Sequence, residues 1–388
     1  MSELTSMTSM TSMTSMTSMA LYGSPAGLGA VAGFSGDPLL TDALIRGRAR
    51  SLPPNDAVPW VRKSGSGFAD TELPAPRPEH MERWQPEVRA HVALQALHRS
   101  LHFGADTNPT GILTAALSYL EVPDAALKGG ALTVSWQPVV TLARPVRSVF
   151  DKQLVKVVDH ARHDGRRHRA PEVLSQILPQ VPFWSSLVPL SPWGNRRSFE
   201  FLGVALHFAM QVCHRFKHVL GVPRPNELSA HVQPILQTPG WSAFPSGHAT
   251  EAFMAARLLR AMLGQAVDSG MHVALQRQAK SIADNRVYAG LHYPIDSVAG
   301  QVLGESLAEY VLSRCSKASA KWTPRTFSGN AKDLEFLDFN PLRDSMDKPN
   351  AWLALGTAVS GAAPDPVMAH MWTKACEEWT SVGFTPEA

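Results

Sequence analysis

Apolar side chains beyond residue 85 recur at helical spacing, and this periodicity limits the fold more than any other feature of the chain. They stand three and four positions apart in three stretches: Ala90-Leu94-Leu97-Leu101, Phe150-Leu154-Val157-Val158 and Phe201-Val204-Ala205-Phe208-Val212. Further helices are predicted at about 247–264, 271–289 and 295–313. Alternating patterns typical of strands are scarce, with Leu132-Val134 and Val139-Val140 as short candidates. The sequence therefore predicts an all-α fold, a helical bundle.

Composition excludes several classes of protein. The 388 residues are 44% hydrophobic, which is enough for a large core and too apolar for a chain that is disordered throughout. The 36 Lys and Arg nearly balance the 33 Asp and Glu, for a net charge of +3. Because phosphate backbones are bound by concentrated positive charge, nucleic acid is not an expected partner.

No segment is expected to span a membrane. The longest apolar run, residues 201–213, contains a histidine and a glutamine and falls short of the roughly 20 residues that a spanning helix needs. The first residues lack a basic region followed by an apolar one, so a secretory signal is not expected. Cys213, Cys315 and Cys376 are odd in number and far apart, as in reduced thiols. We expect a cytoplasmic protein.

Composition also divides the chain. Residues 1–50 begin with repeats of Thr-Ser-Met between Thr5 and Met19, whose period of three forms no apolar face, and are expected to be mostly disordered. Residues 51–190 form the N-terminal helical part, and 191–315 carry the motifs described below. Residues 316–388 comprise an irregular connector, Ser316 to Asp347, and a docking helix over Pro364 to Trp379.

The first motif is a cationic corner. Gly221 suits the left-handed position that ends a helix, which places Lys217 in the last turn. Arg224 follows between two prolines that fix its backbone. Two cations across a rigid corner can point at one anion, although ordinary capping by the lysine and a solvated arginine would give the same pattern.

The second motif is Phe244-Pro-Ser-Gly-His-Ala-Thr250, at the start of a predicted helix. Ser246 and the free N–H groups lie at the positive end of the helix dipole, and Gly247 lets an anion approach the backbone. His248 would stand over that anion and could exchange a proton near neutral pH. A helix cap beside a surface histidine is the alternative.

The third motif runs from Asn285 to Asp296. Pro294 suits a first helical turn, and Asp296 lies four residues after His292. The carboxylate can therefore bind one imidazole nitrogen and leave the other nucleophilic. Arg286 adds a planar fork of donors for an oxyanion. A His–Asp contact at a helix start with a solvated arginine would look the same.

Together the motifs describe a site for a tetrahedral oxyanion whose apical position is filled by imidazole. The pattern Lys-x6-Arg-Pro, Pro-Ser-Gly-His, Arg-x5-His-x3-Asp, from Lys217 to Asp296, resembles the signature of the superfamily that joins vanadium-dependent haloperoxidases and type 2 phosphatidic acid phosphatases. The resemblance implies a helical scaffold from about 85 to 315, with the catalytic core in 191–315. The family often has Ser before the third-motif arginine, where this chain has Asn285.

The resemblance also implies a role for each matched residue. His248 would be the acid or base, and His292, oriented by Asp296, would be the apical vanadium ligand or the nucleophile that forms a phosphohistidine. The equatorial oxygens of vanadate or phosphate would be held by five residues, Lys217, Arg224, Ser246, Gly247 and Arg286. Trp241 and Phe244 occupy positions that would border a halide pocket.

The same motifs serve both activities. The lipid phosphatases of the superfamily span membranes, its bacterial acid phosphatases are shorter exported proteins, and the proline-rich run from Pro225 to Pro245 resembles that of soluble haloperoxidases. We therefore expect a haloperoxidase-like enzyme with vanadate as cofactor and hydrogen peroxide and halide as substrates. Against this, the form His292-Tyr-Pro-x-Asp296 is also the one common in phosphatases, for which no cofactor and a phosphate ester are implied. A non-catalytic oxyanion-binding scaffold is the remaining alternative, and a homo-oligomer is compatible with all three.

One basic segment is expected to have no part in this chemistry. Residues Arg166 to Arg169 and the neighbouring His160, His163 and His168 have no cysteine or carboxylate pattern that completes a metal site. They are interpreted as a charged surface turn at the end of a helix.

Overall fold

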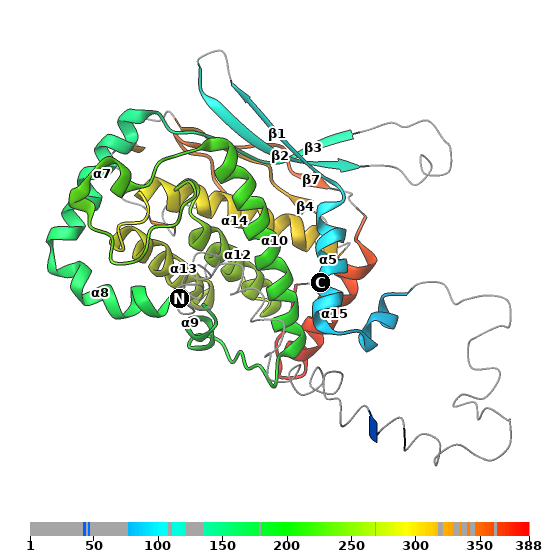
Figure 1. Cartoon of the computed structure of the whole chain (residues 1–388). Coiled ribbons are helices and arrows are strands. Elements are labelled where there is room, and N and C mark those ends of the chain that lie inside the picture. The colour runs from blue at the N-terminus through cyan, green and yellow to red at the C-terminus, as the bar shows by residue number, and fades with distance from the viewer. Residues whose placement is uncertain are drawn as a thin grey trace, which may run out of the picture.

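The helices begin and end largely where the apolar periodicity and the cap residues predict. A computed structural model (Figure 1) describes residues 42–43, 46, 77–107, 111–121, 135–177, 180–267, 269–316, 321–329, 334–335, 340–341, 346–360 and 363–387. The expected disordered segment 1–50 lies almost wholly outside these residues, as does the candidate strand Leu132-Val134. The α-helices are α5 (Pro86–His98), α7 (Arg147–Arg162), α8 (Asp164–Ser175), α9 (Val181–Ser185), α10 (Arg196–Leu220), α11 (Pro225–Leu228), α12 (Gly247–Met262), α13 (Gly270–Tyr288), α14 (Pro294–Cys315) and α15 (Pro366–Thr380), with short 3₁₀ turns at Pro78–Arg83 and Ala230–Val232.

The all-α prediction is wrong in one respect, because the mainly helical body carries a five-stranded sheet. Its strands are β1 (Leu101–Thr107), β2 (Leu113–Glu121), β3 (Ser135–Ala143), β5 (Arg325–Phe327) and β6 (Leu353–Leu355), in the order β1-β2-β3-β5-β6. The first three form an antiparallel meander, and β5 joins β3 in parallel. A separate pair joins β4 (Lys321–Trp322) to β7 (Val359–Ser360). The predicted irregular connector therefore contributes β4 and β5.

The strand signal was present at β2. Leu113, Ala115, Leu117 and Tyr119 alternate with Thr114, Ala116 and Ser118, and Ala115, Leu117 and Tyr119 are buried. This face packs on the helices, where the Tyr119 ring lies 6.1 Å from that of Tyr310 on α14. The apolar spacing beyond residue 85 predicts that Leu101 belongs to a helix. In the structure α5 ends at His98, and Leu101 is the first residue of β1.

The centre of the helical body is α12, which contacts α10, α13 and α14. Two glycines of α14, Gly300 and Gly304, set its closest approach to α12. A Cβ at Gly304 would lie 2.3 Å from the Thr250 carbonyl oxygen, and one at Gly300 would lie 2.8 Å from the Ser246 carbonyl oxygen. Backbone therefore meets backbone at the start of α12, which holds the Ser-Gly-His segment against α14.

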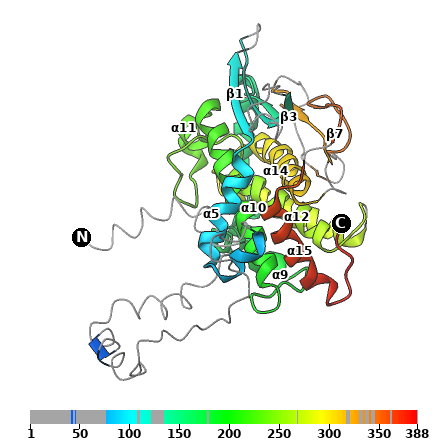
Figure 2. The same ribbon diagram turned by 90° about the vertical axis from the view of Figure 1, so that its right-hand side faces the viewer.

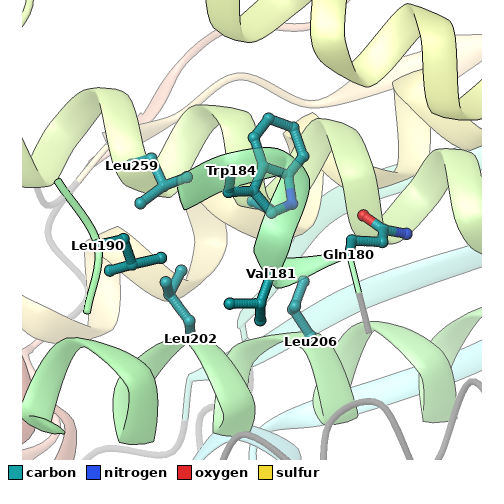
Figure 3. Close-up of a pocket in the computed structure, with 8 residues that line it drawn as sticks. Gln180, Val181, Trp184, Leu190, Leu202, Leu206 and Leu259 are labelled. Atoms are coloured by element: carbon teal, nitrogen blue, oxygen red, sulfur yellow. The ribbon is translucent and has the colours of Figure 1, made fainter. Parts of the chain in front are cut away.

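The C-terminal helix and a small apolar pocket complete the packing around α10. In Figure 2, α15 runs beside α10 and α12, and it also contacts α14. Figure 3 shows side chains of α9, α10 and α12 around a pocket of about 20 Å³, between Trp184, Leu202 and Leu259. That volume is close to what one water needs, so the pocket belongs to the core rather than to a ligand. Among the helices of the described residues, none is both long and apolar enough to cross a membrane.

Candidate functional site

Four helix ends meet at one end of the bundle and bring the three sequence motifs together. The left-handed residue Gly221 (φ 54°) ends α10 just after Lys217, as predicted. Ser246 caps α12, and its N–H donates to the carbonyl oxygen of Asp296 in the first turn of α14 at 2.9 Å. The end of α13 carries Arg286 to the same place. The site is therefore built on helix termini fixed by the fold.

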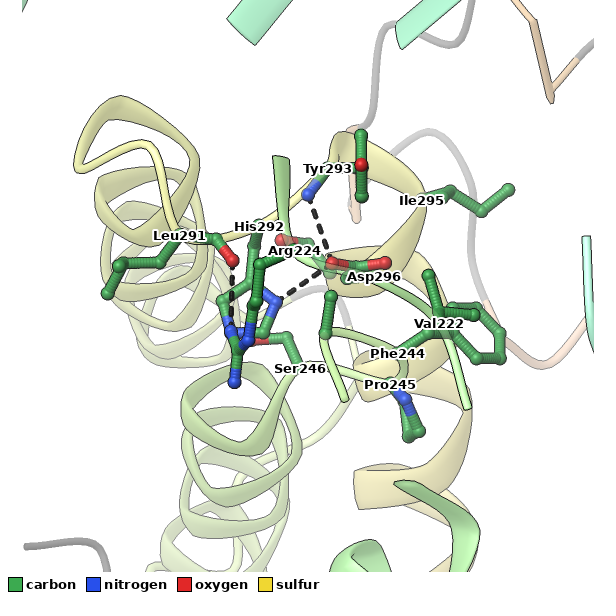
Figure 4. A network of polar contacts seen from close by, with 12 residues as sticks. Val222, Arg224, Phe244, Pro245, Ser246, Leu291, His292, Tyr293, Ile295 and Asp296 are labelled. Carbon is green, nitrogen blue, oxygen red and sulfur yellow. Dashed lines mark hydrogen bonds and ion pairs between the residues drawn. The ribbon is translucent and has the colours of Figure 1, made fainter. Parts of the chain in front are cut away.

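His292 is held as a neutral imidazole of defined orientation (Figure 4). Its Nδ1 lies 2.8 Å from Asp296 Oδ2, which also accepts a hydrogen bond from the Tyr293 N–H at 3.0 Å. Its Nε2 lies 3.0 Å from Arg224 Nη1. A guanidinium can only donate, so Nε2 must be the acceptor and Nδ1 must carry the hydrogen that Asp296 binds. The His292 lone pair is thus directed at a cation, where an oxyanion would be bound.

Arg224 and Lys217 are buried and held by backbone carbonyls. Arg224 donates from Nε to the Trp241 oxygen and from Nη1 to the Leu291 oxygen, both at 2.9 Å. Lys217 Nζ donates to the carbonyl oxygens of residues 242 and 243 at 2.9 and 3.0 Å. Since an ammonium has three donors, these two bonds leave one N–H of Lys217 without an acceptor in the described part of the chain, and a ligand could take it.

Arg286 is fixed by the last turn of α8 and by the residue that follows this helix. Its Nη2 donates to the Val173 oxygen at 2.8 Å and lies 3.4 Å from Gln176 Oε1, which also accepts from Asn285 Nδ2 at 2.9 Å. Arg286 Nε is buried and has no hydrogen-bond partner among the described residues. Buried polar groups almost always have partners, and Arg286 Nε can donate to an anion bound beside it.

The start of α12 supplies backbone donors. The Ser246 hydroxyl accepts from the Ala249 N–H at 3.4 Å, and the first N–H groups of the helix, at Gly247 and His248, have no intrahelical acceptor. A Cβ at Gly247 would meet nothing within 4 Å, so space lies open above the backbone there. The hydrogen bond of His248 to the Gln176 backbone fixes the imidazole nearby.

Burial and the neighbouring cations keep both histidines neutral. Burial, aided by the charges of Arg286 and of the other two cations, lowers the pKa of His248 to about 3. Burial and the charge of Arg224 hold the pKa of His292 well below its ordinary value. Burial also lowers the pKa of Lys217 to about 8 and that of Arg224 and Arg286 to about 10, and raises that of Asp296 to about 7.

These contacts fit a bound tetrahedral oxyanion such as vanadate or phosphate. Three buried cations surround the site, and the carboxylate that binds His292, Asp296, also accepts from a backbone N–H, while Glu227 accepts from the Arg224 N–H at 3.1 Å. An anion of two or more charges would balance the cations and occupy the orphan Arg286 donor. The site residues predicted from the three motifs therefore lie together.

The two residues predicted to border a halide pocket, Trp241 and Phe244, lie in different surroundings. Trp241 is half-buried, and its ring centroid is 5.4 Å from that of His214, one helical turn before Lys217. Phe244 is fully buried, its ring 5.9 Å from that of Phe327, and Figure 4 shows it turned away from His292. Phe244 thus packs in the core, whereas Trp241 stands beside the cations.

His214, Gln176 and Arg166 are three residues to which the motifs gave no role in the site. His214 Nδ1 lies 2.9 Å from the Met210 oxygen, and the charge of Lys217 contributes to its lowered pKa. The prediction of a solvated surface turn is wrong for Arg166, which is buried and donates to the carbonyl oxygens of residues 232 and 289. Gln176 lies in none of the motifs, and its partners on α13, Asn285 and Arg286, are about 110 residues away.

Comparison with known proteins agrees with the geometry. The PAP2 superfamily matches residues 201–319, a range that contains every predicted site residue. No curated protein matches the chain.

Proposed function

Since the chain carries a PAP2 superfamily domain over residues 201–319, we propose that it is a vanadate-dependent haloperoxidase-like enzyme that oxidises halide with hydrogen peroxide. The observation that carries the proposal is the state of His292. Its Nε2 lone pair faces Arg224 at 3.0 Å, while Asp296 binds the hydrogen on Nδ1 at 2.8 Å. An imidazole in this tautomer can coordinate a metal centre.

The other residues would bind the oxyanion around its equator. Lys217, Arg224 and Arg286 supply the positive charge, with Ser246 and the Gly247 N–H as further donors. Bound vanadate would supply an electron-poor centre that activates hydrogen peroxide toward halide without changing its own oxidation state. Trp241 and His214 lie next to the cations, since the charges of Lys217 and Arg224 act on His214, whose ring contacts that of Trp241.

In the anion-free site His248 is neutral, as the base of the peroxidase reaction must be, and a bound vanadate or phosphate would raise its pKa in either reaction. Its pKa, lowered to about 3, leaves it neutral near pH 7 and able to accept a proton from hydrogen peroxide. A phosphatase needs the opposite, a protonated His248 that gives its proton to the leaving oxygen.

A phosphatase of the same superfamily is the second candidate, and the His292-Tyr-Pro-x-Asp296 form favours it. In that reaction His292 Nε2 forms a bond to phosphorus as the bond to the leaving oxygen breaks, His248 protonates that oxygen, and water hydrolyses the phosphohistidine. The bound dianion would have to raise the pKa of His248 by balancing the three cations.

Two assays on one preparation separate these possibilities. Protein incubated with orthovanadate is tested for bromination of monochlorodimedone with hydrogen peroxide and bromide, and untreated protein for hydrolysis of p-nitrophenyl phosphate. Turnover in the first alone supports the proposal, turnover in the second alone supports the phosphatase, and anion binding without turnover supports a scaffold.

The variant His292→Ala should abolish either activity, whereas His218→Ala should not. His218 is exposed on the last turn of α10, next to Lys217, and is therefore a matched control. Full turnover in a folded His292→Ala protein would contradict the assignment.

A further inference from the structure

The residue that follows α8, Gln176, contacts the oxyanion site although it belongs to none of the three motifs. It is fully buried, and its Oε1 accepts from Asn285 Nδ2 at 2.9 Å and lies 3.4 Å from Arg286 Nη2. Its backbone carbonyl accepts a hydrogen bond from the His248 imidazole. One residue therefore contacts two of the groups that are expected to bind the anion or to move a proton beside it.

The orientation of the Gln176 amide is itself fixed by α8. Its Nε2 donates to Glu172 Oε1 at 2.8 Å, one helical turn earlier, and the same oxygen accepts from the Ser281 hydroxyl of α13 at 2.9 Å. Because an ionised carboxylate can only accept hydrogen bonds, the NH₂ end of the amide must face Glu172. The oxygen end is therefore turned toward the donors of Asn285 and Arg286.

The end of α8 holds Arg286 by one of its nitrogen atoms. Arg286 Nη2 donates to the Val173 oxygen at 2.8 Å and lies beside Gln176 Oε1, whereas the buried Nε has no partner among the described residues. Burial lowers the pKa of Arg286, and the charge of Glu172 opposes that change, so this acid lies within electrostatic reach of the guanidinium. A guanidinium held at Nη2 keeps its Nε–H in place for an anion.

The contact joins two parts of the chain. Arg286 and His248 lie within residues 201–319, the range that the PAP2 superfamily matches, whereas Gln176 and Glu172 precede that range. Helices α8 and α13 are in contact, which brings Gln176 to residues about 110 positions away. The N-terminal part of the scaffold therefore reaches the oxyanion site through the end of α8.

We propose that Gln176 is a positioning residue of the oxyanion site, which holds Arg286 in the orientation that binds the anion. A side chain held in place before binding loses less conformational freedom when the anion arrives, so the anion binds more tightly. The proposal rests on the oxyanion site of the proposed function and applies equally to a haloperoxidase and to a phosphatase.

Calorimetric titration of the full chain with sulfate tests the proposal. Gln176→Leu removes the amide oxygen beside Arg286 at similar size and should weaken sulfate binding about tenfold. Gln176→Met, whose side chain is unbranched, should do the same. Gln180→Leu is the matched control, because Gln180 is also buried and its side-chain amide has no hydrogen-bond partner among the described residues. That variant should bind sulfate as the wild type does.

A double-mutant cycle separates positioning from general damage to the fold. Arg286→Met removes the group through which Gln176 is proposed to act, while Lys217 and Arg224 remain to bind sulfate. Gln176→Leu should therefore weaken binding in the wild type and cause no further loss in Arg286→Met. Losses that add in the double variant would overturn the proposal.

Nuclear magnetic resonance gives a second readout. The heteronuclear NOE of the Arg286 Nε–H group reports how rigidly this side chain is held. In the sulfate-free protein it should fall in Gln176→Leu and stay unchanged in Gln180→Leu. Sulfate binding by Gln176→Leu and Gln176→Met that equals the wild type would overturn this proposal alone. A wild type that binds no sulfate would overturn the oxyanion site itself, and this proposal with it.

Discussion

The close approach of α14 to α12 is tested by Gly304→Ala. The new Cβ would lie 2.3 Å from the Thr250 carbonyl oxygen and 3.1 Å from the Met254 nitrogen, whereas ordinary contacts begin at 3.4 Å. The two backbones must therefore separate by 3.4 − 2.3, which is about 1.1 Å. Neither neighbour is a flexible side chain that could turn away.

Two opposing effects determine how Gly304→Ala changes the free energy of unfolding. Overpacking of this kind costs about 3 kcal/mol, and the better helix propensity of alanine returns about 1 kcal/mol. We expect the free energy of unfolding to fall by about 2 kcal/mol. Because the start of α12 carries Ser246 and His248, a shift of about 1 Å should also lower turnover about 100-fold.

The assays are urea denaturation followed by circular dichroism and whichever turnover the wild type shows. Gly270→Ala is the control, because Gly270 is exposed at the first position of α13 and a Cβ there meets nothing within 4 Å. That variant should be as stable and as active as the wild type. A Gly304→Ala protein that is no less stable than Gly270→Ala would refute the reasoning.

Three further outcomes follow from the site. Asp296→Asn removes the charge that orients His292, so turnover should fall about 10²–10⁴-fold in steady-state assays of a protein that still folds. Arg166→Met leaves two carbonyl oxygens without their donor and should lower the free energy of unfolding by about 2–4 kcal/mol in urea titrations. Sulfate, whose own charge is constant above about pH 3, should bind more tightly as pH falls. The bound anion raises the pKa of His248 above its value of about 3 in the free protein, so binding takes up a proton at any pH between the free and the bound pKa. Calorimetry that finds no proton uptake at pH 5 would count against this coupling.

The motifs of the site were predictable because each is short and lies at a helix end. Gly221, Ser246 and Pro294 mark those ends in the sequence, and the chemistry of the adjacent residues follows from helix termini. Family resemblance then indicated that Lys217 and His292 belong to one site. No local rule gives that convergence, since it depends on how four helices pack.

The rest of the fold depends on contacts between distant parts of the chain. Strand β5 has three residues and is stabilised by pairing with β3, about 185 residues earlier, where Val140 faces Arg325. The alternation in β2 was visible in the sequence but was outweighed by the helical pattern on either side. Arg166 illustrates the same limit. Its charge predicted a solvent-exposed side chain, whereas in the structure it is buried and donates to the carbonyl oxygens of residues 232 and 289.

A crystal structure of the protein soaked in orthovanadate tests the central claim most directly. We expect one vanadate bonded to His292 Nε2, with Arg224 displaced from that nitrogen and contacts from Lys217 and the Arg286 Nε. Vanadate bound elsewhere, with the His292 to Arg224 hydrogen bond still in place, would contradict it.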